Sequence, residues 1–437
     1  MTVAENPVPN YFYVDPDTVA RPQQFYQYAR SLGPVFRDPY TGVFILTGYE
    51  DIVRTSMDTD TFSACVVATG PFTDFPGPID ARGTDLASDL ERYHRMGNGR
   101  WTIPFLAYDP PLHSRFRKML SGLFTPRRVM SLAPYIAETC NELLDQVLDD
   151  GEMFYSADFA GRLPIMVTTH LFGVGDDISS LFGGARTRDR GAAQPAADHH
   201  YPTVPLGHPD FRMGETPFFD NVANPFRRYI ERFRAEPTDA IMSKIANGHF
   251  DGTDEMPTID ELLPVVTQVF GAGTETTTAL LKSGMRVLIE NPALQERLRA
   301  DPGLIPNFVE EVLRWDSPTK GHFRLAKVDA EINGVQIPAH SMIFMCYHAG
   351  DRDEERFADP NTFDVERENA RQHLAFGHGP HLCLGAHVAR LEAQGAFTAL
   401  ISRMANLRLA ADAAMPRPIP SFLLSELGEM HVAFDRV

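Results

Sequence analysis

The sequence predicts a mainly α-helical fold with a smaller β-rich lobe, organised as one domain over residues 1–437. Three observations lead to this prediction. Residues 258–290 carry apolar side chains at helical spacing between a helix start signal and a stop signal. Two shorter stretches, 34–55 and 324–344, instead have β-rich runs around turn signals. No internal repeat or linker divides the chain.

Composition excludes several classes of protein. The 437 residues are 43% hydrophobic, enough for a sizeable core, and their formal net charge of −18 argues against nucleic acid or an anionic membrane as the main partner. The four cysteines lie far apart without paired spacing, which is typical of a reducing compartment. The N-terminus lacks the basic start and apolar core of a signal peptide, and no apolar run approaches about 18 residues. We therefore expect a soluble cytoplasmic protein.

The β-rich N-terminal part spans about 34–65. Within it, residues 34–55 predict a hairpin in which two short β-rich runs flank a turn at Tyr40, Thr41 and Gly42. An Asn333-Gly334 pair between apolar runs predicts a second hairpin.

Residues 182–217 are dominated by Gly, Pro, Ala, Asp and His. A loop of this length in a compact domain is either a lid or a mobile, disordered segment. Composition favours the second alternative without excluding the first, and His199 and His200 are expected to face solvent.

The long predicted helix begins with a capping-box pattern at Thr258 and Glu261 and stops at Asn291-Pro292. Its middle, 271–278, has two glycines and four threonines where a buried helix would carry Leu and Ala. An interior glycine costs about 1 kcal/mol relative to alanine, and threonine hydroxyls compete for backbone carbonyls. This interruption indicates either a functional site or close packing against a neighbouring helix.

Cys383 lies in the run FGHGPHLCLG, residues 376–385, before a helical pattern over 386–404. At that position backbone N–H groups and the positive helix end favour a thiolate, which is a metal ligand. Gly379 and Gly385 lack Cβ, so the backbone can fold tightly around the sulfur and a large flat group can approach.

Two other interpretations of Cys383 exist. A lone cysteine is most often a small buried apolar residue. A zinc site could use His378, His381, Cys383 and His387, although their spacing matches no common zinc pattern and leaves both glycines without a purpose.

The Cys383 run resembles the heme-binding signature of the cytochrome P450 family, Phe-x-x-Gly-x-x-x-Cys-x-Gly. The matching residues are Phe376, Gly379, Cys383 and Gly385, with His381 two positions before the cysteine. Three further motifs of the family follow the same order along the chain. They are Asp109-Pro110-Pro111 with His113, the helix groove at Ala272, Gly273, Glu275, Thr276 and Thr277, and the Glu-x-x-Arg motif at Glu311 and Arg314.

The resemblance implies a mostly α, prism-like fold and heme b, iron protoporphyrin IX, as cofactor with Cys383 as the iron ligand. It assigns cofactor binding to His113, Arg117, Arg324, Phe376, Gly379, His381, Cys383 and Gly385. Glu311, Arg314 and Arg367 would form a buried network that supports folding around the heme.

The activity implied is that of a heme-thiolate monooxygenase, which inserts one oxygen atom of dioxygen into a hydrophobic small molecule and so hydroxylates it. In this scheme glycine lets the long helix widen beside dioxygen, and Glu275 and Thr276 form a catalytic proton relay. A peroxide-driven peroxygenase and a non-catalytic heme-binding protein are the alternatives.

The family also implies electrons from NAD(P)H through ferredoxin reductase and ferredoxin, delivered to a monomer. Residues 111–130 contain no acidic residue but five basic ones, namely Arg115, Arg117, Lys118, Arg127 and Arg128. This basic stretch is either a ferredoxin docking surface or a solvated helix face.

By family position, the substrate pocket draws on the loop 64–104, the segment 182–217 and residues 422–424. The individual candidates are Val269, Phe270, Ala272, Thr319, His322, Phe323 and Leu423. These mostly apolar residues suit a hydrophobic substrate, and His322 or Lys320 could anchor a polar group. Many relatives carry an Arg-Gly pair where this chain has Ser425-Glu426.

Overall fold

The computed structural model describes residues 18, 21–39, 41–67, 104–181, 218–250, 252–419, 421 and 423–437. The turn residue Tyr40, most of the loop 64–104, the segment 182–217 with His199 and His200, and Phe422 lie outside these residues. The predictions for them therefore stay predictions.

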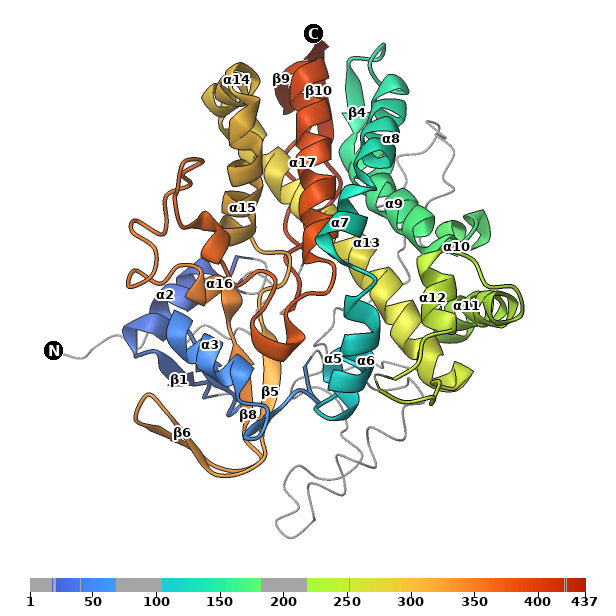
Figure 1. Cartoon of the computed structure of the whole chain (residues 1–437). Helices are drawn as coiled ribbons and strands as arrows, with labels where there is room; N and C mark the ends of the chain where they lie inside the picture. The colour runs from blue at the N-terminus through green and yellow to red at the C-terminus, as the bar shows by residue number, and fades with distance from the viewer. Residues whose placement is uncertain are drawn as a thin grey trace, which may run out of the picture.

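Helices form most of the described chain (Figure 1). Those of the first half are α2 (Gln23–Ser31), α3 (Tyr49–Met57), α5 (Pro104–Ala107), α6 (Leu112–Ser121), α7 (Pro126–Met130), α8 (Ala133–Asp145), α9 (Arg162–Phe172), α10 (Asp176–Leu181), α11 (Phe218–Ala235) and α12 (Ile241–Ala246). Those of the second half are α13 (Ile259–Glu290), α14 (Pro292–Ala300), α15 (Ile305–Trp315), α16 (Tyr347–Gly350) and α17 (Ala386–Arg403). Short 3₁₀ or π turns are η2 (Ser156–Ala160), η3 (Pro302–Leu304), η4 (Ala370–Gln372) and η5 (Gly379–His381).

The strands form three sheets among the described residues. The largest has the order β1-β2-β8-β5-β3, with β1 (Val35–Arg37), β2 (Phe44–Leu46), β8 (Met342–Met345), β5 (His322–Ala326) and β3 (Phe62–Ser63). A second sheet has the order β4-β10-β9, with β4 (Glu152–Phe154), β10 (His431–Arg436) and β9 (Met404–Leu409). The third is the hairpin of β6 (Ala330–Ile332) and β7 (Val335–Ile337).

Both predicted hairpins are present, with one correction. β1 pairs antiparallel with β2, and β6 pairs antiparallel with β7 around Asn333 and Gly334, both of which have positive φ. The prediction that the first hairpin extends over 34–55 was wrong at its C-terminal end, because α3 begins at Tyr49. Glu50 and Asp51 lie in the first turn of α3, where acidic side chains stabilise a helix.

Helix α13 begins and ends as the sequence predicts. The Thr258 hydroxyl accepts the Glu261 N–H at 3.2 Å, and the Glu261 carboxylate accepts the Thr258 N–H at 2.7 Å, so the capping box is complete. The helix runs for 32 residues between the β-rich side that contains β5 and β8 and the side that contains α10, α11 and α12 (Figure 1).

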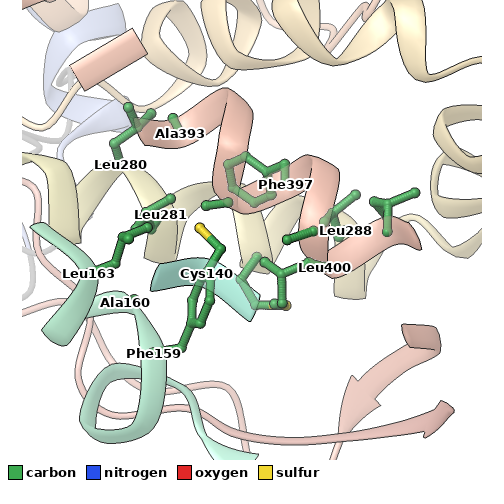
Figure 2. Close-up of a cluster of buried hydrophobic side chains, with 14 of the residues drawn as sticks. Cys140, Phe159, Ala160, Leu163, Leu280, Leu281, Leu288, Ala393, Phe397 and Leu400 are labelled. Carbon is green, nitrogen blue, oxygen red and sulfur yellow. The ribbon is translucent and has the colours of Figure 1, made fainter. Parts of the chain in front are cut away.

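The largest core cluster forms where α13 meets α8, α9, α15 and α17, and Figure 2 shows part of it. Leu280, Leu281 and Leu288 of α13 pack there with Phe397 of α17. A side chain at Gly284 would place its Cβ 2.2 Å from the Phe397 ring, so glycine lets α13 and α17 approach closely. Close packing thus explains this glycine of α13, and it fixes α17, which follows Cys383, against the long helix.

The structure also bears on membrane insertion and on cysteine chemistry. Within the described ranges, no helix combines the length and apolar character that crossing a bilayer requires. Cys65, Cys140, Cys346 and Cys383 are all free thiols.

Candidate functional site

The loop that carries Cys383 is closed by its own backbone. The Cys383 N–H donates to the Phe376 carbonyl oxygen at 2.9 Å. Gly377 and Gly379 have φ of 69° and 71°, a left-handed conformation that favours glycine. A Cβ at Gly379 would also lie 2.8 Å from the carbonyl oxygen of Ser56 in α3. The glycine therefore lets the loop pack on α3, just before α17 begins.

Cys383 lines a cavity of about 470 Å³ with basic residues around it. Arg117, Arg371 and Arg390 contribute to the same lining. The Cys383 side chain is accessible from this cavity, yet protein atoms surround its sulfur closely enough that desolvation raises the pKa of the thiol. Backbone N–H groups at the start of α17 and the charges of Arg117 and Arg390 act in the opposite direction.

As the sequence predicts, the backbone N–H groups at the start of α17 favour the thiolate, but burial raises the pKa of the thiol by more than they lower it. A bound metal cation is the group that deprotonates a coordinating thiol. The site thus suits metal ligation better than it suits a free nucleophilic thiolate.

Four basic side chains expected to bind the cofactor converge beside this loop. The rings of His113 on α6 and His381 are 4.0 Å apart, and the charges of Arg117 and Arg324 act on both. Arg324 on β5 is 2% exposed. Burial first, then the neighbouring arginines, lowers the pKa of His113 to about 4, and the pKa of His381 also falls well below its usual value.

These basic groups fit an anionic ligand. Both ring nitrogens of His381 and Nδ1 of His113 are buried without a hydrogen-bond partner. A buried polar group without a partner is costly, so such a group in a native protein calls for a ligand. The two carboxylates of heme b would supply acceptors and opposite charge at this place. A Cβ at Gly385 would meet no atom within 4 Å, so open space for a flat group adjoins the cysteine loop.

His322 belongs to the same basic cluster. Its Nδ1 lies 3.2 Å from the Tyr347 hydroxyl, and the ring is close enough to His381 to contribute to the lowered pKa of His381. Burial and Arg324 lower the pKa of His322 to about 3. The sequence had suggested His322 for a polar group of the substrate, whereas the structure places it with the residues proposed for the cofactor carboxylates.

The threonines of α13 bond to their own helix. The Thr276 hydroxyl donates to the Ala272 carbonyl oxygen at 2.7 Å, and the Thr277 hydroxyl donates to Gly273 at 3.0 Å. Glu275 is exposed and Thr276 is half-buried. The predicted widening of the helix is absent, because α13 is α-helical from Ile259 to Glu290. A Cβ at Gly273 would lie 3.4 Å from the Thr168 hydroxyl on α9, close to an ordinary contact distance, so packing alone does not require glycine there.

The Glu-x-x-Arg residues form a fully buried ion pair. The Arg314 guanidinium donates two hydrogen bonds of 2.7 Å to Glu311, and both side chains are 0% exposed. Arg367 adds a third bond to Glu311 at 3.1 Å. Arg314 also donates to the carbonyl oxygens of Asp351 and Pro360. The structure thus brings together all three residues that the sequence assigned to this network.

A second buried network adjoins the first and was not found from the sequence. Glu310 accepts hydrogen bonds from Arg390 on α17 and from His373, which precedes the cysteine loop. The Arg390 guanidinium lies over the Phe376 ring at 4.5 Å. The network therefore joins α15 to the base of the loop and to the helix that follows it.

The substrate-pocket candidates divide into two groups. Val269 and Thr319 are half-buried, and Ala272 is exposed. Phe270 and Phe323 are both 0% exposed, because Phe270 packs on Phe172 and Phe226, and Phe323 packs on Phe344. The prediction that these two phenylalanines line a substrate cavity was wrong. Leu423 is 6% exposed and packs in the core of the β-rich lobe, so the same prediction was wrong for it.

The structure does not support the zinc interpretation of Cys383. Throughout the part of the chain that the structure describes, no three His, Cys, Asp or Glu side chains lie close enough together to hold a metal ion. His381 faces His113 and the arginines rather than a shared metal position with Cys383.

Comparison with known proteins gives a consistent result. The family model described as "Cytochrome P450" matches residues 219–302 and 303–424. A 6-deoxyerythronolide B hydroxylase from Saccharopolyspora erythraea is 34% identical over 75% of this chain and 77% of its own length. A steroid C26-monooxygenase from Mycobacterium tuberculosis is 33% identical over 75% of this chain and 79% of its own.

Solved structures agree with the sequence comparisons. The substrate-free Mycobacterium marinum cytochrome P450 CYP150A6 superposes with a TM-score of 0.84 at 30% identity, over 98% of this chain and 99% of that one. Cys383, the glycines of its loop and the unpartnered histidines fit the cofactor of such proteins. This chain therefore belongs to the cytochrome P450 family, the heme-thiolate monooxygenases that bind heme b.

Proposed function

We propose that this chain is a ferredoxin-dependent monooxygenase that hydroxylates a hydrophobic small molecule, with Cys383 as the iron ligand. The assignment of the heme site beside Cys383 rests on one observation. The nitrogens of His381 and His113 that lack partners are buried beside the loop that presents Cys383. The heme, when bound, activates dioxygen so that one oxygen atom can enter a C–H bond of the substrate.

In this proposal His113, Arg117, Arg324 and His381 hold the two heme carboxylates. Arg324 is fixed on β5, and its Nη1 donates to the Phe323 carbonyl oxygen at 2.9 Å. His113 is fixed by its place in the first turn of α6. Just before this helix, the Asp109 carboxylate accepts a hydrogen bond from the Ala64 N–H at 2.8 Å. Phe376, Gly379 and Gly385 shape the loop around the flat group.

Glu275 and Thr276 provide the proton path. The Thr276 hydroxyl donates to Ala272, and its oxygen keeps lone pairs with which to accept a second hydrogen bond. Rotation of this hydroxyl would let Oγ1 pass a proton to the oxygen substrate, and the exposed Glu275 carboxyl would restore that proton from solvent. Ala272 lies exposed one turn earlier, which leaves room for a small molecule beside the hydroxyl.

The proposed ferredoxin surface differs from the basic stretch that the sequence suggested. Arg115 pairs with Glu255 and lies over the Phe250 ring, so its charge is already neutralised by a neighbouring carboxylate. Arg356 and Arg371 instead line the cavity with Cys383. Lys118 and Arg127 are exposed on neighbouring elements. An acidic ferredoxin would be steered to this cationic surface, which lies next to the proposed iron ligand.

Val269, Ala272 and Thr319 remain the candidates for contact with the substrate. Their apolar or small side chains suit a hydrophobic ligand. Relatives named for 6-deoxyerythronolide B and for steroids support a substrate of that general character.

We also propose that 1–437 is one cytoplasmic domain. α13 supports this, since its residues contribute to two core clusters, and the four free thiols support a reducing compartment.

The test is reconstitution. A compound that converts the heme iron from low to high spin would be incubated with the protein, ferredoxin, ferredoxin reductase and NADPH. The proposal expects substrate-dependent dioxygen uptake and a hydroxylated product. Product formed only with hydrogen peroxide would establish the peroxygenase alternative, and no uptake with any bound compound would contradict the monooxygenase assignment.

A further inference from the structure

A buried carboxyl group that neither network above uses lies beside the base of the Cys383 loop. It belongs to Asp351, the residue that follows α16, and Asp351 is 0% exposed. Its Oδ1 accepts the Leu374 N–H at 2.6 Å. Its Oδ2 is buried and has no hydrogen-bond partner. One oxygen of this side chain thus ties the end of α16 to Leu374, and the other is unsatisfied.

Leu374 joins this carboxyl group to the loop. The Leu374 carbonyl oxygen accepts the Gly377 N–H at 2.7 Å, and the Phe376 carbonyl oxygen accepts the Cys383 N–H at 2.9 Å. The Leu374 side chain is 1% exposed and packs on α16, since a Cβ at Gly350 would lie 2.7 Å from its Cδ1. Leu374 is therefore bonded to the carboxyl group on one side and to the loop on the other.

Two arginines act on Asp351 through their charges, but their hydrogen bonds go elsewhere. Arg314 uses its five N–H groups for Glu311 and for carbonyl oxygens, including the backbone carbonyl of Asp351 itself. Arg352 donates to backbone carbonyl oxygens of α15 and α16. An ionised carboxylate at Asp351 would therefore place a charge in the interior with no donor for Oδ2, which is costly.

Burial accordingly favours the neutral acid. It raises the pKa of Asp351 to about 8, although the Leu374 N–H and the charges of Arg314 and Arg352 act in the opposite direction. The Glu311 carboxylate adds to the rise. Three further titratable groups interact with Asp351, namely Tyr49 on α3 and Cys346 and Tyr347 at the start of α16. Burial raises the pKa of each of them as well, so they stay neutral while Asp351 ionises.

We infer that Asp351 is a positioning residue that works as a neutral acid, and that its ionisation in alkaline solution releases Leu374 and with it the loop that presents Cys383. The inference rests on the proposed role of Cys383 as the iron ligand. Asp351 acts only through Leu374. Once ionised, its side chain is drawn toward water, and the bond from Oδ1 to the Leu374 N–H is lost.

The direction of the pH dependence follows from this arrangement. The pKa of Asp351 in the folded protein lies above the ordinary value of 3.8, so the protonated form is the one that the fold stabilises. Its contribution to stability is complete below pH 3.8 and decreases as the pH rises toward 8. Asparagine at this position keeps the acceptor oxygen and cannot ionise.

Asp351→Asn tests the inference, and Asp38→Asn is the matched control. Asp38 is also 0% exposed and also has one buried oxygen without a partner. It lies in the turn between β1 and β2, where its other oxygen accepts the Thr41 N–H at 2.7 Å. Both variants would be prepared as heme-loaded protein and compared with the wild type.

The first measurement is the spectrum of the reduced protein with carbon monoxide from about pH 6 to about pH 10. In the wild type the red-shifted band of thiolate-ligated heme should be lost as the pH passes about 8 to 9. The midpoint of this loss should rise by about one pH unit or more in Asp351→Asn and stay within about 0.3 pH unit of wild type in Asp38→Asn.

The second measurement is backbone hydrogen exchange at residues 374–377. Wild type and Asp351→Asn are compared at the same pH, because intrinsic exchange itself depends on pH. Their rates should agree within about twofold near pH 6, and exchange should be about tenfold faster in the wild type near pH 9.

Equal midpoints in wild type and Asp351→Asn, equal exchange near pH 9, or the same rise in midpoint in Asp38→Asn would overturn the inference. If Asp351→Asn does not fold, infrared spectra of wild-type protein with isotope-labelled aspartate decide. The carbonyl band of a neutral aspartic acid should be present near pH 6 and absent near pH 9, and its absence at both would overturn the inference. If Cys383 is not the iron ligand, the red-shifted band is missing at every pH, whereas exchange and the infrared band still report on Asp351.

Discussion

Arg390 donates two hydrogen bonds to Glu310, from Nε at 2.6 Å and from Nη2 at 3.0 Å. His373 adds a third from Nε2 at 3.1 Å, while its Nδ1 accepts the Ala375 N–H. Burial lowers the pKa of His373, so this ring is a neutral donor at pH 7 and Arg390 supplies the positive charge. The carboxylate of α15 thus holds both sides of the Cys383 loop.

This network predicts a specific acid sensitivity. Burial alone would raise the pKa of Glu310, but the bonds from His373 and Arg390 outweigh it and lower that pKa from 4.5 to about 2. Such a lowering corresponds to about 3 kcal/mol of stability, present in full above pH 4.5 and lost as the pH falls toward 2. Glu310→Gln should therefore lower the free energy of unfolding by about 3 kcal/mol at pH 6 and by little near pH 2.

Urea unfolding at a series of pH values measures this difference. Glu296→Gln serves as the control, since Glu296 belongs to an exposed pair with Arg299 and should lose under about 1 kcal/mol at every pH. A Glu310→Gln deficit that does not shrink on acidification would show that the ionised carboxylate is not the stabilising form.

The Glu311–Arg314 pair predicts a folding defect. Arg314→Ala leaves the fully buried Glu311 carboxylate without its bidentate partner, and removing one member of a buried pair costs about 3 to 5 kcal/mol. We expect little or no heme-loaded protein from this variant. Arg297→Ala, which breaks the exposed Arg297–Glu366 pair on α14, should give a normal yield of heme-loaded protein. Equal heme yields from the two variants would refute the role of the network.

The Thr276 hydroxyl predicts a defect in coupling rather than in binding. Thr276→Ala should keep the heme spectrum and substrate affinity but divert electrons to hydrogen peroxide, because the proposed proton donor is lost. Thr276→Ser should restore most of the coupling. Thr278→Ala, which removes a hydroxyl bonded to Thr274 and Ala160, is the control on the same helix. The ratio of product to NADPH consumed is the measurement, and full coupling in Thr276→Ala would remove Thr276 from the relay.

The basic cavity predicts salt-sensitive reduction. Arg371 is exposed and lines the cavity with Cys383, so Arg371→Glu should slow heme reduction by an acidic ferredoxin about tenfold or more at low salt. Added salt should reduce the difference from wild type because it screens the charges. Arg436→Glu, at the exposed Arg436–Asp149 pair on β10, should leave the rate unchanged. A wild-type rate that does not vary with ionic strength would contradict this docking surface.

The sequence predicted those parts of the molecule whose signals are local. The Thr258 capping box, the Asn333-Gly334 turn and the loop before α17 each depend on a few adjacent residues, and the structure contains all three. The Glu310 network could not be found in this way, because its partners lie 63 and 80 residues further along the chain. Its only signal was the presence of His373 and Arg390 on either side of the Cys383 motif.

Burial explains the other differences. Family position suggested Phe270 of α13 for the substrate pocket, but it did not tell that this side chain packs on Phe172 and Phe226, so a core residue was taken for a pocket residue. Likewise, the start of α17 lowers the pKa of the Cys383 thiol locally, while atoms from distant segments raise it more. Burial is the sum of many contacts with residues distant in the sequence, so a short sequence motif does not predict it.

The most direct test of the account is the absorption spectrum of the reduced protein with carbon monoxide. If the Cys383 thiolate is the iron ligand, the wild type shows the red-shifted Soret band of thiolate-ligated heme, and Cys383→His loses this band while retaining heme. A wild-type band at the position of histidine-ligated heme, or an unchanged red-shifted band in Cys383→His, would contradict the assignment.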